Sequence, residues 1–176
     1  MNDLLPEIEA RRARRALDER AIPEEVVRRL LTAATLAPSC FNSQPWRLLA
    51  VRQAGELEIV RANLTSGNYW ARKAPLVVLV CRLDDRRDYA LFGSGLAVEN
   101  LLLQATREGL IAHPIAGFKP APIKEALGIP QELILITLVI VGYPGEEAGL
   151  NEKHRAQEHA PRSRKPLSEV VRYERW

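Results

Sequence analysis

The sequence predicts an α+β fold in which helices flank a mixed sheet. Helical and strand-like segments follow one another without the regular strand–helix–strand alternation of a parallel α/β domain. The 176 residues fit one domain and leave little room for a second. Hydrophobic residues make up 47% of the chain, which is enough for a buried core and too much for a disordered chain. We therefore expect residues 1–176 to form one folded, water-soluble domain.

The first third of the chain predicts two helices and a strand. Residues 6–17 favour helix, and Arg11 and Arg15 would share one face of it. A second helix should span 23–37, because the proline at its first position gives up no needed N–H and another proline follows its end. This helix carries an apolar stripe at helical spacing, made of Val26, Val27, Leu30, Leu31 and Ala34. The short apolar run 46–51 predicts a strand.

The rest of the chain predicts two further strands and one long helix. The valine-rich run 76–81 is almost continuously apolar, which is typical of a strand buried on both faces. Residues 89–108 predict the longest, central helix, with Gly109 as its stop. A third strand is expected over 133–141, before a turn rich in glycine and proline. The polar stretch 151–164 predicts irregular structure.

The tail, residues 165–176, is unusual for a chain end, because frayed ends are mostly polar. Its apolar side chains are Leu167, Val170, Val171, Tyr173 and Trp176. Such groups gain free energy when they leave water, so the tail predicts a contact either with a partner subunit or with its own domain. The spacing alone does not choose between these two contacts.

Charge and cysteine content exclude several classes of function. With 25 Lys and Arg against 22 Asp and Glu, the net charge of +3 is too small to predict binding to nucleic acid. Cys40 and Cys81 stand far apart, so neither a disulfide framework nor a zinc site is expected, and no other metal site is indicated. The sequence shows neither a secretory leader nor a membrane span, and we expect a cytoplasmic protein without a membrane partner.

The familiar motifs of nucleotide and acyl chemistry do not occur in this chain. It has no GxGxxG, GxxxxGK[ST] or G-x-S-x-G motif. An enzyme with this sequence would rely on a bound cofactor for its chemistry. Two arginine clusters, 11–15 and 162–164, could together hold a phosphate group through charge-assisted hydrogen bonds. A solvated helix face is the plainer interpretation of such a charge run.

The stretch 37–46 is the most informative part of the sequence. It places Ser39, Asn42, Ser43 and Gln44 between two prolines, which predicts a stiff loop that presents hydroxyl and amide groups. Asn and Gln side chains offer both a donor and an acceptor, and can bind the polar edge of a flat heterocycle. A plain turn rich in Ser and Asn is the alternative.

With these motifs in this order, the chain resembles the FMN-dependent nitroreductase family from its first arginines to its last tryptophan. Residues 11–15 are similar to the family's RRSxR motif, and 37–46 to its APSxxNxQPW segment, which is the most specific match. Further runs resemble, in turn, the entry to the second strand, the long central helix, the loop beside the flavin and the C-terminal phosphate-binding motif: 67–75, 95–110, 114–118 and 162–167.

The resemblance implies an FMN site shared between the two subunits of a homodimer, whose tails, 165–176, embrace the partner. The phosphate would be held by arginines from both chain ends: Arg11, Arg12, Arg15, Arg162 and Arg164. The flavin would also contact a loop of the other subunit, through Pro38, Ser39, Cys40, Asn42 and Gln44. Along the ring would lie Pro114, Ile115, Ala116 and Gly117, with the backbone N–H of Ala116 donating toward N5.

The same resemblance implies the reaction. NADH or NADPH would reduce FMN, and the electrons would pass by a ping-pong mechanism to a small electron-poor acceptor, such as a nitroaromatic, a quinone or an enone. The alternative is a flavoprotein of the same fold with another reaction, dehalogenation or ring fragmentation, or one that binds FMN without turnover. Three positions depart from the family pattern: Ala13 replaces a usual Ser, Ala116 a common Glu, and Gly93 a frequent Asp.

Overall fold

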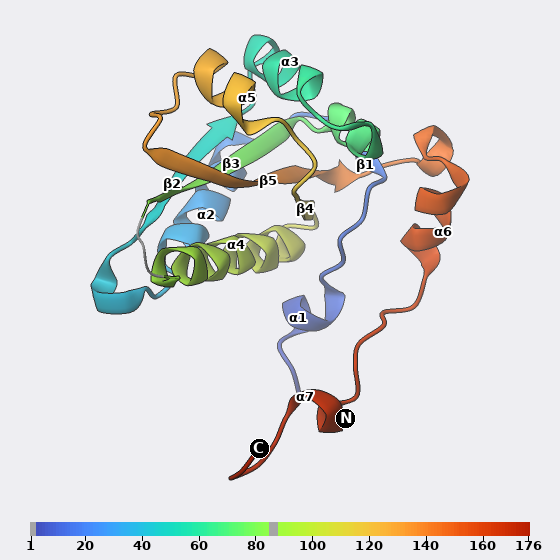
Figure 1. Ribbon diagram of the computed structural model, residues 1–176. Helices are drawn as coiled ribbons and strands as arrows, with labels where there is room; N and C mark the ends of the chain where they lie inside the picture. Colours follow the sequence, from blue (N-terminus) through green and yellow to red (C-terminus); the bar gives the residue numbers. More distant parts are fainter. Residues whose placement is uncertain (1–2, 85–87) are drawn as a thin grey trace.

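The computed structural model describes residues 3–84 and 88–176, and within them the chain forms a five-stranded sheet (Figure 1). The strand order is β1-β5-β3-β2, and β4 also pairs with β5. Each of these pairings is antiparallel. The strands span Leu17–Asp18 (β1), Trp46–Val51 (β2), Leu76–Leu83 (β3), Ile111–Ile115 (β4) and Leu133–Pro144 (β5). The α+β class predicted from the sequence is confirmed.

Helices cover both faces of the sheet. On one face lie α2 (Glu24–Thr35) and α4 (Tyr89–Arg107), and on the other lie α3 (Ala54–Ala62) and α5 (Pro120–Ala126) (Figure 1). The short helices near the chain ends are α1 (Pro6–Ala10), α6 (Glu152–His159) and α7 (Leu167–Val170). The central sheet is therefore shielded from water on both sides, while the two chain ends lie outside the sandwich.

Alternate residues of β3 point to opposite faces of the sheet and join two buried clusters. The cluster toward α2 and α4 includes Leu30, Val78, Val80, Leu101 and Val139. The cluster toward α3 and α5 includes Val60, Val77, Leu79, Ile123 and Leu138. This arrangement confirms the two-sided burial expected from the continuous apolar run 76–81.

The structure corrects the secondary structure expected at both ends of the chain. The helix expected over 6–17 ends at Ala10, because the following residues bond to the C-terminal segment and β1 pairs with β5. The stretch 151–164 is not irregular throughout, since α6 forms within it and the Asn151 side chain accepts the N–H of His154 at its start. Sequence patterns did not indicate α3, α5 or β4.

The tail stays exposed in the single chain. Its large apolar side chains are 66% (Leu167), 53% (Val170), 73% (Tyr173) and 96% (Trp176) accessible. Figure 1 shows α7 and the C-terminus well away from the sheet. Packing of this tail on its own domain does not occur in the structure, and a partner subunit as its cover remains a prediction. In the described part of the chain, no helix has the length and apolarity that a membrane span requires.

Candidate functional site

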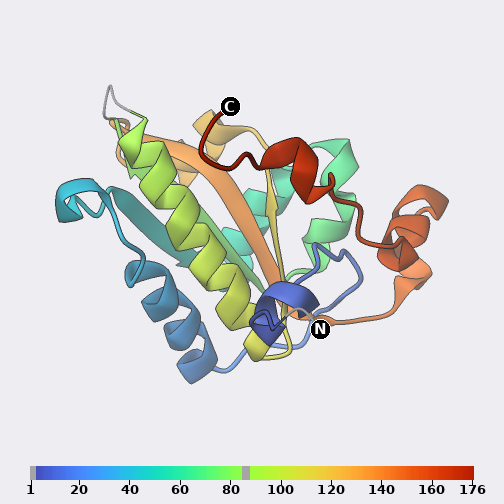
Figure 2. The same ribbon diagram turned by 90° about the horizontal axis from the view of Figure 1, so that it is seen from below.

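The two arginine clusters predicted from the sequence come together in space. Residues 11–14, 157–158 and 160–164 line a pocket of about 250 Å³. The first segment leaves α1 and runs toward β1, and the second follows α6 (Figure 2). Five of the lining residues are arginines: Arg11, Arg12, Arg14, Arg162 and Arg164.

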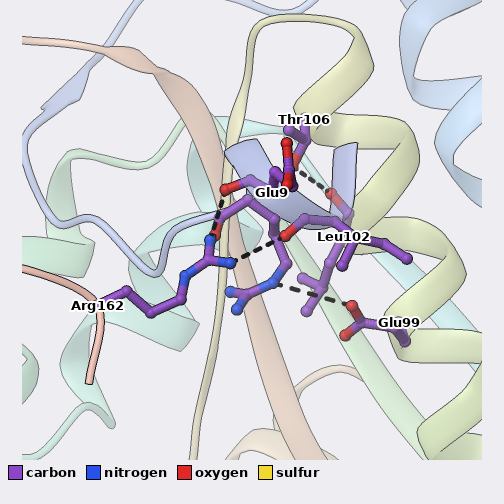
Figure 3. Close-up of polar contacts among 7 residues, drawn as sticks. Glu9, Glu99, Leu102, Thr106 and Arg162 are labelled. Carbon is purple, nitrogen blue, oxygen red and sulfur yellow. Dashed lines mark hydrogen bonds and ion pairs between the residues drawn. The ribbon is translucent and has the colours of Figure 1, made fainter. Parts of the chain in front are cut away.

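Two of these arginines bind the main chain of the opposite segment. The two terminal nitrogens of Arg162 donate to the carbonyls of Ile8, at 3.1 Å, and of Glu9 and Arg11, both at 2.7 Å (Figure 3). In return, Nη2 of Arg12 donates to the carbonyl of Ala160 at 2.5 Å. The N-terminal and C-terminal segments are thus joined by charge-assisted hydrogen bonds in both directions.

Acidic side chains hold two further arginines in place. Nε of Arg11 lies 3.8 Å from the carboxylate of Glu99 on α4 (Figure 3). The backbone N–H of Arg15 donates to Oε1 of Glu158 at 2.9 Å, and Glu158 is only 7% exposed. Glu158 also lines the pocket, so its charge opposes an anion there. Arg164, by contrast, is exposed and donates to the carbonyl of the adjacent Ser163.

An aromatic platform supports this segment from the sheet side. The guanidinium of Arg15 lies 5.8 Å from the ring centre of Trp70, whose other neighbour is the His113 ring at 4.8 Å. Nδ1 of His113 lies 3.1 Å from the carbonyl of Arg14. Because a carbonyl only accepts, Nδ1 carries the hydrogen. Burial, aided by the charges of Arg15 and Arg11, lowers the pKa of His113 to about 4, so the ring is neutral at pH 7.

Sequence reasoning assigned no role to Glu158, His113 or Trp70. Trp70 stands in the stretch 67–75 that resembles the family, and that is the only signal any of the three carries. Glu158 lies in a stretch expected to be irregular, and His113 contacts the arginine segment only after β4 has paired with β5. Their contacts are long-range, and no local pattern encodes them.

The loop over residues 38–45 forms a strained turn after α2. Oγ of Ser39 accepts the backbone N–H of Gln44 at 2.9 Å and closes the loop. Phe41, Asn42 and Gln44 have φ angles of 52°, 54° and 44°, a region that residues other than glycine rarely adopt. Such strain is concentrated at functional sites. The stiff polar loop expected here is therefore present, with the side chains of Asn42 and Gln44 exposed.

An apolar pocket lies between this loop and the start of α4. Its volume is about 560 Å³, and its lining consists of Pro38, Ser39, Cys40, Asp88, Tyr89, Phe92 and Leu96. Phe41, beside it, is 92% exposed. The same loop lies close to α4 at Gly93. A Cβ at this position would lie 3.3 Å from Cγ of Pro45 and 3.4 Å from Cβ of Ser39. A side chain at this position would require the loop to shift by a few tenths of an ångström.

The stretch 114–117 is half strand and half loop. Pro114 and Ile115 belong to β4, and the side chain of Ile115 is buried in the core. Ala116 is exposed directly after the strand. The carbonyl of Gly117 then accepts three hydrogen bonds. Thr65 donates its backbone N–H at 3.0 Å and its hydroxyl at 3.1 Å, and Asn68 donates Nδ2 at 2.9 Å. These bonds fix the backbone around Ala116.

The arginine pocket and the polar loop lie on different sides of α4. Ser39 approaches this helix at Gly93, and Arg11 approaches it at Glu99. Six positions along a helix are turned by about 120° about its axis, so the two contacts face different directions. Figure 2 shows the loop after α2 on one side of α4 and α1 on the other. One chain therefore holds the two halves of the expected site apart.

Comparison with known proteins places this geometry in context. The model of the nitroreductase family matches residues 8–66 and 56–143. A Thermus thermophilus protein named NADH dehydrogenase is 29% identical over 198 residues, covering 92% of this chain and 91% of its own. A solved structure described as an oxidoreductase containing FMN has a TM-score of 0.88 and 28% identity, covering 98% and 92% of the two chains.

The relatives also differ in chemistry. A Haliscomenobacter hydrossis protein named iodotyrosine deiodinase is 29% identical over 187 residues, covering 85% of this chain and 83% of its own. Proteins that carry different names are thus similar in sequence to this chain. Among the described residues, no group of three or more His, Cys, Asp or Glu side chains is arranged to hold a metal ion.

Proposed function

The chain belongs to the nitroreductase family, and on this premise we propose that it is an FMN-dependent oxidoreductase. It takes electrons from NADH or NADPH and passes them to a small electron-poor acceptor such as a quinone, a nitroaromatic or an enone. The observation that carries this proposal is the arginine pocket, which gathers cationic side chains from both ends of the chain around about 250 Å³.

The residues of the pocket fit a terminal phosphate. Guanidinium groups bind phosphate through paired hydrogen bonds, and the pocket is lined by arginines from two segments that are held together by their own contacts. The proposed phosphate site comprises Arg11, Arg12, Arg162 and Arg164, which line the pocket, and Arg15, which follows Arg14 of its lining; each contacts the phosphate or holds those that do. The chain lacks the glycine-rich fingerprint of a dinucleotide site, which favours the mononucleotide FMN over FAD.

The proposed ring site lies next to Ala116. Its backbone N–H is placed at the end of β4 and is available in any residue except proline, so replacement of the family's Glu by Ala leaves this donor intact. Thr65 and Asn68 hold the adjacent carbonyl of Gly117. We assign to these contacts the orientation of the N–H toward N5 of the flavin.

The second half of the proposed site comes from another copy of the chain. Pro38, Ser39, Cys40, Asn42 and Gln44 lie on the far side of α4 from the arginine pocket. A homodimer with a two-fold axis would bring this loop of one subunit over the flavin of the other. The exposed apolar side chains of the tail, residues 165–176, would cover the partner and gain the burial that they lack in the single chain.

In this mechanism the protein supplies placement and electrostatics. Bound FMN would supply reversible hydride and electron transfer between donor and acceptor. The arginine pocket anchors the phosphate, and the main-chain donor at Ala116 stabilises negative charge that develops beside it. The apolar lining of the pocket beside Ser39 favours uncharged acceptors. The neutral His113 contributes no proton at pH 7.

The proposal predicts that the purified protein is yellow and releases FMN, and no FAD, on denaturation. It also predicts steady-state oxidation of NADH or NADPH that depends on an added quinone or nitroaromatic, with the parallel reciprocal plots of a ping-pong reaction. Chromatography of the released flavin and absorbance at the nicotinamide band provide the two measurements. A colourless protein that FMN cannot reconstitute would contradict the proposal.

Reductive dehalogenation is the second candidate, because a relative of similar identity is named iodotyrosine deiodinase. The same phosphate and ring contacts would serve this reaction, so the acceptor half-reaction separates the two candidates. Reduced enzyme should be offered a quinone, a nitroaromatic and an iodinated phenol in parallel. Halide release that is faster than quinone or nitroaromatic reduction would favour dehalogenation.

A further inference from the structure

Arg162 occupies a position in the C-terminal segment where the resemblance implies a direct phosphate ligand. In the structure its guanidinium is turned toward the N-terminal segment instead (Figure 3). Nη1 donates to the carbonyl of Ile8, and Nη2 donates to the carbonyls of Glu9 and Arg11. The side chain lies at the surface, and both of its terminal nitrogens are engaged by the main chain.

Two of these three carbonyls, those of Ile8 and Glu9, lie in the last turn of α1 and need a donor. Helix α1 ends at Ala10, and the last carbonyls of a helix have no partner within it. The last turn of α1 contains no basic residue of its own. Arg162 supplies the missing donors, and its planar fork spans neighbouring carbonyls in a way that a point charge does not. The direction of the chain after α1, which carries Arg11 and Arg12 into the pocket, is thereby fixed.

The opposite contact has the same form. Arg12 donates to the carbonyl of Ala160, two positions before Arg162. Its neighbour Arg11 provides one of the carbonyls to which Arg162 donates. Each segment therefore holds the other through one arginine. Arg164 differs from both, because its bond is to the neighbouring carbonyl of Ser163 and not to the opposite segment.

We propose that Arg162 is a positioning residue, which clasps the end of α1 and thereby sets the pocket arginines for phosphate, while Arg164 contacts the phosphate itself. This inference rests on the proposed function, since it concerns the same FMN site. It departs from the direct phosphate contact that the resemblance implies for Arg162. The two arginines lie two positions apart and carry the same charge, so they provide matched controls for each other.

The test compares Arg162→Lys and Arg162→Ala with Arg164→Lys and Arg164→Ala in the full-length chain. Dissociation constants are measured for FMN and for riboflavin, which lacks the phosphate. Hydrogen exchange over residues 7–12 is measured with and without FMN. Lysine keeps the charge and remains a good phosphate ligand, but its single nitrogen does not span the carbonyls of Ile8, Glu9 and Arg11.

If Arg162 clasps the end of α1, Arg162→Lys should lose FMN affinity as severely as Arg162→Ala. We expect a loss of about tenfold in both, the size of one charge-assisted hydrogen bond. Riboflavin affinity should be unchanged in both variants, because riboflavin has no phosphate. A general loss of structure would instead weaken the binding of both FMN and riboflavin. Exchange over residues 7–12 should accelerate without FMN in both Arg162 variants and in neither Arg164 variant. Arg164→Lys should keep most of the affinity that Arg164→Ala loses.

The opposite pattern would overturn the inference. If Arg162→Lys binds FMN like the wild type and exchange over residues 7–12 is unaltered, Arg162 is a phosphate ligand. The proposed function fails separately, if the wild-type chain binds FMN no more tightly than riboflavin. In that case the exchange measurement still decides whether the clasp exists. Should Arg162→Ala not fold, the Lys variant alone carries both readouts.

Discussion

His113 is the single residue whose ionisation is tied most directly to the arginine segment. Its ring packs on Trp70 and donates to the carbonyl of Arg14, and burial lowers its pKa from 6.5 to about 4. The unfolded chain therefore takes up a proton as the pH falls below 6.5, whereas the folded chain does so only near 4. The free energy of unfolding must fall across that interval, by at most about 3 kcal/mol from this residue.

We predict that His113→Gln flattens the pH dependence of stability between pH 6.5 and 4. Glutamine can still donate to the carbonyl of Arg14, but it does not titrate. Urea unfolding at several pH values measures the slope. A smaller slope should remain, because burial also lowers the pKa of His154. An identical slope in the variant and the wild type would contradict the assignment of this pH dependence to His113.

Gly145 marks the closest approach between β1 and the end of β5. A Cβ at this position would lie 2.4 Å from the carbonyl carbon of Leu17 and 2.5 Å from the nitrogen of Asp18, both backbone atoms that cannot swing aside. We predict that Gly145→Ala destabilises the fold by about 1 to 3 kcal/mol in urea unfolding. Gly55→Ala is the control, since Gly55 lies in α3 with nothing within 4 Å of the added atom, and it should not destabilise. Equal stability of the two variants would refute the steric argument.

Individual residues were predictable from the sequence where a local motif carried them. The arginine clusters and the Ser39 to Gln44 loop stand in recognisable runs, and the structure brings the clusters together as expected. The assignment of a shared face to Arg11 and Arg15 failed, because it assumed a helix where the chain is extended. The direction of the Arg162 side chain was also not predictable, since it depends on carbonyls more than 150 positions away in the chain.

At the scale of elements, the pairing of α2 and α4 is secured at its end by a charged clamp. Nε and Nη2 of Arg29 donate to the two carboxylate oxygens of Glu108 at 2.6 and 2.8 Å, and Gln104 adds a bond at 2.9 Å. The hydrogen bond from Arg29 is the main reason that the pKa of Glu108 is lowered. A carboxylate with a lowered pKa stabilises the fold above its unfolded pKa, and this contribution is lost as the pH falls.

We predict that Glu108→Gln makes the protein modestly less stable at pH 7, with a difference from the wild type that shrinks toward about pH 3, where the unfolded carboxyl is protonated. Thermal unfolding at both pH values is the measurement. Glu58→Gln serves as the control, because Glu58 bonds Arg61 within one helix and should matter less. A difference that stays constant with pH would argue against the clamp.

Elements were predictable in proportion to the strength of their hydrophobic pattern. The spans of β2, α2 and α4 follow from apolar periodicity, and Gly109 ends α4 with a φ of 71°. The polar α6 has no apolar stripe, and its start depends on the side chain of Asn151. The helix expected over 6–17 stops early because contacts with the C-terminal segment outweigh the local preference of those residues.

At the scale of the whole molecule, the two halves of the proposed site lie on different sides of α4. The sequence suggests candidate residues for each half, but neither periodicity nor composition reveals which halves meet across an interface. The resemblance supplied that expectation. The exposed tail, with Trp176 at 96% accessibility, is the part of the fold that gains most from a partner.

Complementation between two defective chains tests the central claim most directly. One chain carries Arg15→Ala with Arg164→Ala, which removes two of the proposed phosphate ligands. The other carries Asn42→Gly with Gln44→Gly, which removes the loop amides while glycine keeps the positive φ angles. The two chains are tagged differently and co-expressed, and the heterodimer is purified through both tags.

Flavin content per dimer then decides the question. Each variant alone should retain little FMN. The heterodimer should hold about one FMN, half the content of the wild-type dimer, because two-fold symmetry pairs the one intact pocket with the one intact loop. It should also oxidise NADH or NADPH at about half the wild-type rate per dimer, since it has one of two sites. A heterodimer as empty as its parents would contradict the account and show that the site is built within one chain.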